Sequence, residues 1–268
     1  MSTPPQPPAP DPAAAPAAPD LVRVAHERGI TTLTLNSPAT RNALSAPLVA
    51  ALRTALDRAA ADPRTRAVLL AHTGGTFCAG LDLKAPCAPA DFLALLAAIP
   101  ALPVPVLARV TGHVRAGGLG LLGVCDLVAA GADADFAFTE THLGLAPAVI
   151  TAPLLPRLDP RAASRYLLTA EVFGPAEAAR IGLITLHAAP GTAADGVDAA
   201  LAPVLAGLRR AAPTALAATK ELLTAGLRAG LDRDGARLTE LSVALFAAPE
   251  AREGITARFE RRDPAWAL

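Results

Sequence analysis

Short apolar runs separated by polar turns dominate the first half of the chain, a pattern typical of β-strands joined by tight loops. Residues 21–27 and 30–36 are two such runs, and Arg28-Gly29 between them predicts a hairpin. Four further runs predict strands, at residues 67–72, 104–110, 127–130 and 136–139.

Segments with helical periodicity alternate with these strands and then follow them in the second half of the chain. Ser45 is a good cap for a helix that runs to about residue 61, with Leu48, Leu52 and Leu56 on one face. A second helix is expected near 91–99, and the glycine-rich stretch 112–123 leads into a third. Beyond residue 148 the strand signals fade, and helices are predicted at 160–169, 175–182, 194–211, 214–229, 231–247 and 249–260.

Strands that alternate with helices, followed by a helical tail, predict an α/β core with a C-terminal α region. Residues 1–20 contain eight prolines and only two charges, so we expect a disordered Pro/Ala-rich tail rather than a secretory signal. The predicted core spans residues 21–205 and the predicted C-terminal helical region spans 206–268.

Composition excludes several classes of protein. The chain has 24 basic and 24 acidic side chains, and this balance argues against a nucleic-acid partner. Its longest uncharged apolar run, residues 92–108, is interrupted by three prolines and is shorter than the ~20 residues that a membrane span needs. The three cysteines form no CxxC pair, so neither a disulfide framework nor a zinc site is predicted, and we expect a cytoplasmic protein with no metal.

Three glycine-containing turns stand out as candidate chemistry. They are residues 76–84 (TFCAGLDLK), 112–120 (GHVRAGGLG) and 136–147 (FAFTETHLGLAP). In the first two, a strand ends and small residues allow a sharp turn into a helix. The first N–H groups of such a helix lack internal partners, so two neighbouring turns could aim two amides at one developing oxyanion. Taken singly, each turn is more often only a tight turn or a close packing contact.

Residues 118–123 (GLGLLG) also match the dinucleotide fingerprint, with Glu140 about twenty residues further on. The fingerprint should begin where the strand ends, and here residues 111–117 intervene. A nicotinamide oxidoreductase is therefore a disfavoured reading, and we expect no cofactor.

In their order and spacing, the three turns resemble the crotonase superfamily, the enoyl-CoA hydratase/isomerase family. Residues 36–45 resemble its first CoA-binding loop, residues 169–183 its "LTG…AEA…GL" segment, and residues 253–262 its C-terminal signature. The resemblance covers about residues 21–265. It implies a spiral of ββα units with a C-terminal helical trimerisation region, an acyl-CoA substrate, and a homotrimer or homohexamer. Coenzyme A would then be part of the substrate rather than a cofactor.

The resemblance also implies roles for individual residues. The backbone amides of Leu81 and Gly117 match the pair that polarises the thioester carbonyl. The positions that match or adjoin CoA- and substrate-binding sites are Arg41, Ala43, Ala79, Asp82, Lys84 and Gly118. Arg115 replaces an apolar or small residue, and could meet an acidic acyl group or a CoA phosphate, or pair with a nearby acid.

The sequence departs from the family at the positions of the two catalytic glutamates. Glu140 matches one of the two glutamates of the hydratases, whereas the other position, six residues before Asp126, is Gly120. Hydration of a 2-enoyl thioester needs a proton removed from water and another delivered to Cα, so Glu140 would have to do both or be helped. Moving a double bond from C3 to C2 needs only one base. Enoyl-CoA hydratase is our first expectation, Δ3,Δ2-enoyl-CoA isomerase the second, and a CoA-binding protein without activity the third. His113 and His142 flank the turns as weaker candidates.

Overall fold

The computed structural model describes residues 20–192 and 195–268. The predicted tail, apart from Asp20, lies outside the described residues. The strands are β1 (Val22–Glu27), β2 (Ile30–Leu35), β3 (Ala67–His72), β4 (Thr76–Cys78), β5 (Val106–Val110), β6 (His113–Arg115), β7 (Leu127–Ala130), β8 (Phe136–Ala137) and β9 (Leu186–His187). The helices are α1 (Ala46–Ala61), α2 (Pro89–Ala101), α3 (Gly117–Val124), α4 (Ala148–Leu154), α5 (Pro160–Thr169), α6 (Pro175–Arg180), α7 (Gly196–Arg210), α8 (Pro213–Ala247) and α9 (Pro249–Glu260), with short 3-10 turns η1 (Pro38–Thr40) and η2 (Thr141–Leu143).

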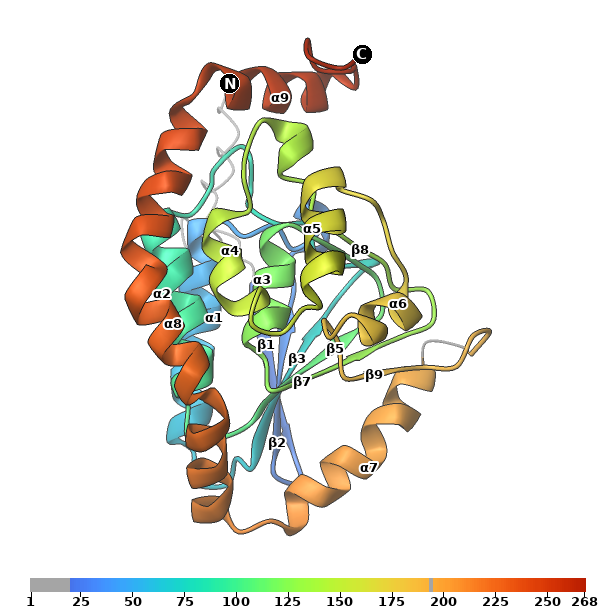
Figure 1. Ribbon diagram of the computed structural model, residues 1–268. Coiled ribbons are helices and arrows are strands. Elements are labelled where there is room, and N and C mark those ends of the chain that lie inside the picture. Colours follow the sequence, from blue (N-terminus) through green and yellow to red (C-terminus); the bar gives the residue numbers. More distant parts are fainter. Residues whose placement is uncertain (1–19, 193–194) are drawn as a thin grey trace, which may run out of the picture.

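The described strands form two sheets. The larger has the order β1-β2-β3-β5-β7-β9 and is parallel except for the β1–β2 hairpin, and the smaller is the parallel set β4-β6-β8. The chain passes from a strand of the large sheet into a strand of the small sheet and then into a helix, as in β3-β4-α2 and β5-β6-α3. Successive helices α1 to α4 pack on one another beside the sheets (Figure 1). The chain is therefore a spiral of ββα units, as predicted.

Local chemistry accounts for the elements that begin this spiral. Arg28 and Gly29 both have positive φ (47° and 83°), the backbone that a two-residue hairpin turn of this hand requires. The Ser45 side chain accepts a hydrogen bond from the amide of Leu48 at 3.4 Å and so caps α1. The predicted hairpin and the predicted capped helix are both confirmed.

The C-terminal helices differ from the prediction in two ways. The expected helices 214–229 and 231–247 form one continuous helix, α8, because α8 packs along α2 on both sides of Gly230: Thr224 donates to the carbonyl of Pro100, and Gly235 lies against Leu93. In addition, α7 runs across the boundary predicted between residues 205 and 206. The separate short elements β4, β6, β9 and α4 were not predicted.

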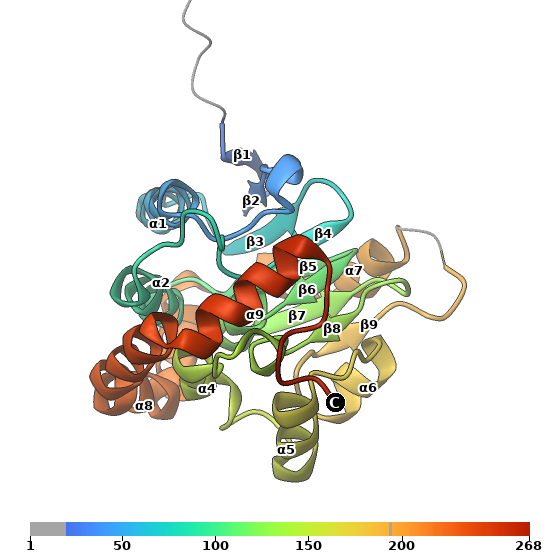
Figure 2. The ribbon, with the colours of Figure 1, turned by 90° about the horizontal axis from the view of Figure 1, so that it is seen from above.

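A buried lysine fastens α8 to the core. Lys220 is 3% exposed, and its ammonium donates to the carbonyls of Ile99 and Val104 at 2.9 Å each and pairs with Asp126 at 2.9 Å. From the top of α8 the chain turns into α9, which crosses above the ends of the β4, β6 and β8 strands (Figures 1 and 2). Among the described residues, no helix has both the length and the apolar character that crossing a membrane requires.

Candidate active site

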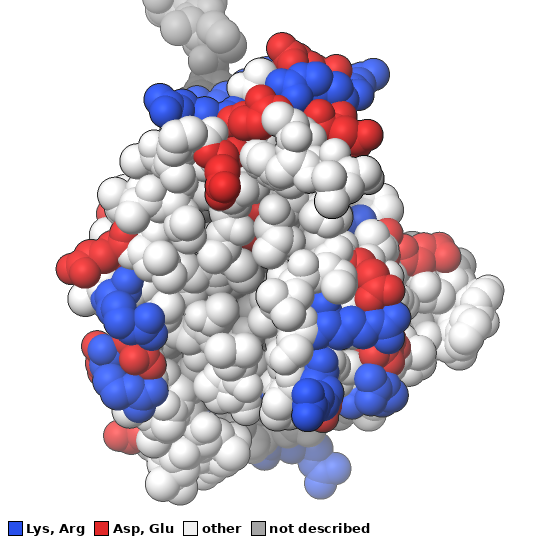
Figure 3. Space-filling view, turned by 45° about the horizontal axis from the view of Figure 1, so that its top comes forward, with Lys and Arg blue, Asp and Glu red and all other residues white. Residues whose placement is uncertain are grey.

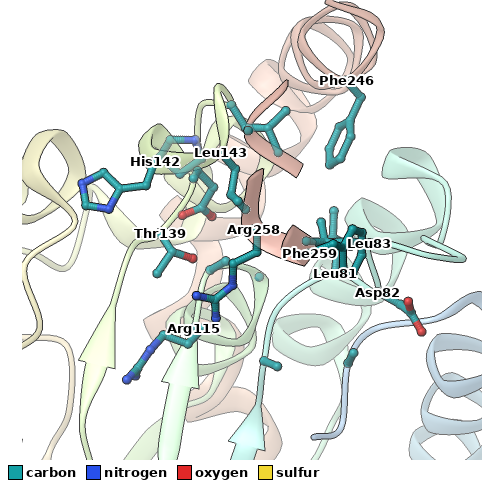
Figure 4. Close-up of a pocket in the computed structure, with 18 of the residues that line it drawn as sticks. Leu81, Asp82, Leu83, Arg115, Thr139, His142, Leu143, Phe246, Arg258 and Phe259 are labelled. Carbon is teal, nitrogen blue, oxygen red and sulfur yellow. The ribbon is translucent and has the colours of Figure 1, made fainter. Parts of the chain in front are cut away.

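A cavity of about 1160 Å³ lies beneath α9, where the turns after β4, β6 and β8 meet. Leu81, Gly117 and Glu140, one residue from each of the three turns singled out in the sequence, all line it. In Figure 4, Leu81, Leu83 and Phe259 gather on one side of the cavity, and Thr139 and Leu143 lie on the other. The three turns are therefore neighbours in space.

Gly80 allows the turn after β4 to lie in contact with the turn after β6. It has φ +89°, and a Cβ built on it would lie 2.8 Å from the Cβ of Ala116 and 3.4 Å from the amide nitrogen of Gly117. A side chain at this position would therefore push the turn after β4 away from the start of α3. The backbone that leads into Leu81 therefore lies against the start of α3, and both Leu81 and Gly117 line the cavity.

Both of these amides lack a backbone partner. Gly117 is the first residue of α3, where the N–H groups of a helix are free and the helix dipole is positive. Ala116 before it has φ 48° and ψ −120°, a strained backbone for a residue with a Cβ. Within residues 20–192 and 195–268, neither the Leu81 nor the Gly117 amide donates a backbone hydrogen bond. Each of these N–H groups is therefore free to donate a hydrogen bond to an oxygen atom in the cavity.

The third turn holds a buried carboxyl. The carbonyl of Glu140 accepts hydrogen bonds from the amides of Leu143 and Leu145 at 2.9 and 3.0 Å, which makes Glu140 the first residue of a tight turn. Its side chain is 9% exposed, and its Oε2 atom has no hydrogen-bond partner within the described chain. Burial raises the pKa of Glu140 to about 7, because the charged carboxylate loses its hydration. Such a group can release and recover a proton near neutral pH.

The place where a second acid was expected is closed by apolar side chains. A Cβ on Gly120 would lie 2.5 Å from Cγ2 of Ile150 and 3.4 Å from Cζ of Phe92. Ile150 and Phe92 therefore fill the space above Gly120, and both line the cavity. Sequence reasoning did not find these two residues, because their contact with α3 depends on how α2 and α4 pack around it.

Several cationic side chains line the cavity. Arg41, Lys84 and Arg258 all line it, and no ion pair to any of them occurs in the described parts of the chain. The Lys84 ammonium lies 5.8 Å from the centre of the Phe259 ring. Arg258 extends from α9 into the cavity in Figure 4 and was not singled out in the sequence. Ala43 and Ala79 also line this region, as expected.

Other expected site residues line the cavity but direct their polar groups elsewhere. The Asp82 carboxylate accepts from the amides of Lys84 and Ala85 and so orders its own loop. Arg115 donates to Asp135 at 2.6 Å, the third of the roles expected for it, and His113 contacts the same carboxylate at 2.8 Å. The side chains of Asp82, Arg115 and His142 point away from the centre in Figure 4.

Gly118 and the apparent dinucleotide fingerprint serve packing. A Cβ on Gly118 would lie 2.9 Å from both the Cβ and the carbonyl oxygen of Cys78, so this glycine packs against β4 and is not among the residues that line the cavity. Residues 118–123 lie within α3, whose residues are all buried. The stretch is therefore not a loop that could cradle a phosphate.

The sequence profile of the enoyl-CoA hydratase/isomerase family matches residues 25–267. The chain belongs to this family. A crystal structure of an enoyl-CoA hydratase from Mycobacterium avium is 45% identical, covers 92% of this chain and 99% of its own, and superposes with a TM-score of 0.84. A relative from Thermus thermophilus, named as an inferred enoyl-CoA hydratase, is 36% identical over 252 residues (89% of this chain and 98% of the relative). The 2,3-dehydroadipyl-CoA hydratase of Escherichia coli is 31% identical over 250 residues (90% and 96%).

Membership in this family confirms the resemblance found in the sequence and the predicted fold class, a mixed α/β spiral with a C-terminal helical region. The chain is accordingly an enzyme of the enoyl-CoA hydratase/isomerase kind, with an acyl-CoA thioester as its class of substrate.

Proposed function

We propose that the chain is an enoyl-CoA hydratase in which Glu140 alone handles the protons. The observation that carries the proposal is the buried Glu140 carboxyl, with a free Oε2 and a pKa near 7, in the same cavity as two unpartnered amides. The thioester oxygen would accept hydrogen bonds from the amides of Leu81 and Gly117. Oriented donors of this kind are worth about 3–4 kcal/mol each when charge develops on an oxygen.

The reaction then proceeds with one carboxylate. Glu140 takes a proton from water as the water oxygen bonds to Cβ, and the electron pair of the double bond moves to the thioester oxygen to form an enolate. When the enolate collapses, Glu140 returns the proton to Cα. The carboxylate is thus regenerated, and the net change is the addition of water. A pKa near 7 suits a group that acts first as base and then as acid.

The cations of the cavity support coenzyme A as the carrier. Coenzyme A is polyanionic, and Arg41, Lys84 and Arg258, which form no ion pair within residues 20–192 and 195–268, would meet its phosphates. Arg258 could equally meet a carboxylate on the acyl group, as the E. coli relative's 2,3-dehydroadipyl substrate would carry. A panel of neutral and carboxylated 2-enoyl-CoA esters, assayed with Arg258→Ala, separates the two roles: loss on all esters indicates phosphate, and loss on carboxylated esters alone indicates the acyl group.

The test of the proposed reaction is the hydration of crotonyl-CoA, followed by loss of the enoyl thioester absorbance. The enzyme should consume crotonyl-CoA, and Glu140→Gln should lower kcat by 10² or more while binding of a saturated acyl-CoA is retained. Hydration that survives the substitution would contradict the assignment. A wild-type protein that binds acyl-CoA but turns over no enoyl ester would instead be a binding protein.

A second reaction is favoured by one observation. Ile150 and Phe92 leave no room for a second acid beside Gly120, and moving a double bond from C3 to C2 needs only a single base that removes and returns one proton. A Δ3,Δ2-enoyl-CoA isomerase would generate the 2-enoyl absorbance from a 3-enoyl-CoA. The ratio of the two rates decides between the reactions.

We further propose that the chain forms a homotrimer or a hexamer of two trimers and acts in the cytoplasm. Two leucines on the outer side of α8 support the assembly, because Leu222 and Leu223 are 80% and 77% exposed in the single chain. The apolar side chains of α8 lie in three settings: Leu238 is buried within the chain, Phe246 lines the cavity, and Leu222, Leu223 and Leu241 are exposed.

A further inference from the structure

The helix α9 touches the turn that carries Glu140 through backbone atoms on both sides. A Cβ on Gly254 of α9 would lie 2.5 Å from the carbonyl carbon and oxygen of Leu143. From the opposite direction, a Cβ on Gly144 would lie 2.6 Å from the carbonyl carbon and oxygen of Glu250. Side chains can rotate out of a close contact, but backbone carbonyls cannot, so both positions accept only glycine without a movement of α9 or η2.

The residues of α9 that face η2 are uniformly small. Ala251, Gly254 and Ala257 are all buried and succeed one another at intervals of three, which lays the helix flat on the turn. Gly144 has φ +68°, the left-handed conformation that ends η2 and returns the chain toward α4. The tight contact is therefore made by two glycines that lie 110 residues apart in the chain.

This contact reaches Glu140 in one further step. The amides of Leu143 and Leu145, on either side of Gly144, both donate to the carbonyl of Glu140. A shift of the Leu143 backbone therefore moves the backbone from which the Glu140 side chain enters the cavity. In addition, Gly254 and Ala257 line that cavity, as does Arg258 on the same helix.

We propose that Gly254 is a positioning residue for the carboxyl of Glu140: by letting α9 rest on the backbone of η2, it fixes where that carboxyl lies relative to the amides of Leu81 and Gly117. The proposal rests on the proposed function in one respect, that Glu140 is the acid–base group. Because α9 both lines the cavity and contacts the turn of Glu140, a substrate that contacts α9 would also affect the position of the Glu140 carboxyl.

The expected consequence of adding a methyl group at position 254 follows from the distances. A carbon 2.5 Å from another must retreat by about 1 Å to reach ordinary contact, and misplacement by this much at a reacting centre can lower a rate by about 10². Retreat of η2 also admits water to Glu140. Because burial is what raises the pKa of this carboxyl, its pKa should fall toward the ordinary value.

Neighbouring charged groups do not account for the raised pKa of Glu140. The raised pKa of Glu140 comes from burial, with only its own backbone acting against it. No charged group of the elements packed on η2 is among the causes of this shift; these groups are His142 on η2 itself, Glu250, Arg252, Glu253, Arg258 and Glu260 on α9, and Arg161 and Arg165 on α5.

The experiment compares Gly254→Ala with Gly207→Ala, a glycine-to-alanine change in α7 where nothing lies within 4 Å. For each folded variant, kcat and KM for a 2-enoyl-CoA are measured against pH, and the Glu140 carboxyl is titrated by 13C NMR. Gly254→Ala should lower kcat by 10-fold or more with a smaller change in KM, and the midpoint of the Glu140 titration should move below about 7. Gly207→Ala should change neither.

Two results would overturn the proposal: an unchanged kcat in folded Gly254→Ala, or a lower kcat with the Glu140 midpoint unmoved, which is what a purely structural loss would give. If Gly254→Ala does not fold, Gly144→Asn introduces the same kind of steric contact between η2 and α9. Asparagine is chosen because it tolerates the left-handed backbone at this position. Hydrogen exchange of the wild-type protein tests the contact between α9 and η2 whether or not the variants fold. The amides of Leu143 and Leu145 should exchange together with those of α9, and much faster exchange of the Leu143 and Leu145 amides would also overturn the proposal.

These outcomes are distinct from failure of the proposed function. A wild-type enzyme without hydratase or isomerase turnover would remove the assignment of Glu140 as the acid, but the NMR titration and the exchange data would still decide whether Gly254 holds that carboxyl in place.

Discussion

At the scale of single residues, Glu140 combines reactivity with a penalty in stability. Its carboxyl is buried with no partner for Oε2 in the described part of the chain, and the resulting rise of its pKa to about 7 would let it exchange a proton at neutral pH. The same burial means that the folded state must hold an uncompensated charge whenever the group is ionised. Activity and stability at this position therefore change in opposite directions.

We expect Glu140→Gln to stabilise the protein at alkaline pH. The folded state keeps the Glu140 proton up to about pH 7, whereas the unfolded state loses it near 4.5, so between these values the folded state binds more protons and its stability falls as pH rises. The variant lacks this loss. Urea unfolding should show little difference near pH 4.5 and a gain of up to about 3 kcal/mol at pH 8.

The matched control is Glu221→Gln, which alters an exposed glutamate on α8. It should leave the pH dependence of unfolding as in the wild type. A Glu140→Gln variant whose advantage is the same at pH 5 and pH 8 would show that the carboxyl is not buried with a raised pKa.

At Gly120, it is the absence of a side chain that allows the neighbouring residues to pack. Gly120→Ala places a methyl group 2.5 Å from Cγ2 of Ile150, and we expect overpacking to lower the free energy of unfolding by about 1–3 kcal/mol. Ile150→Ala removes Cγ2, so the double variant should be more stable than the sum of the two single changes predicts. Additive losses in thermal unfolding would contradict a direct clash.

At the scale of elements, α8 is positioned by one buried ion pair. Lys220 reaches Asp126 and two backbone carbonyls on neighbouring segments, and it is this anchor, together with packing against α2 and α4, that holds a 35-residue helix along the core. The helix carries Ser242 and Phe246 to the cavity wall and leads into α9. Distant packing thus determines the shape of this part of the cavity wall.

Lys220→Met should test this anchor. Removing the ammonium leaves the Asp126 carboxylate without its counter-ion, and we expect a loss of about 3 kcal/mol or more in urea unfolding. Arg53→Met, which breaks the exposed pair with Asp57 on α1, should leave stability unchanged within error. Equal effects of the two substitutions would show that burial does not distinguish these pairs.

At the scale of the whole molecule, charge and apolar surface are distributed unevenly. On the face shown in Figure 3, a broad uncharged area occupies the middle, and basic and acidic side chains lie beside one another around its edges rather than in a basic stripe. Exposed leucines on α8 add to the apolar surface of the single chain. Large exposed apolar areas are typical of surfaces that bind another protein.

We expect the full chain to be oligomeric in solution and Leu222→Glu/Leu223→Glu to disrupt the assembly, because charges would be buried at an apolar contact. Light scattering should give the mass of three or six chains for the wild type and a smaller mass for the double variant. A wild-type monomer would contradict the proposed assembly.

Much of the fold could be predicted from the sequence where local chemistry decides it. Two positive-φ residues, Arg28 and Gly29, make the hairpin, and Ser45 caps α1, so both elements appear where the sequence predicts them. The candidate amides and Glu140 were also predicted, since the three turns that hold them are marked by small residues and by a family resemblance. Very short strands such as β4 and β6 were missed because three residues carry no readable period.

By itself, then, the sequence determined the order of the longer elements, the family, and which turns line the cavity. Only the tertiary structure decided that α8 continues through Gly230, that Arg115 pairs with Asp135, that Ile150 fills the space over Gly120, and that α9 rests on the turn of Glu140. The physical reason is the same in each case. These features depend on contacts between segments far apart in the chain, and such contacts leave no local pattern of hydrophobic and polar residues.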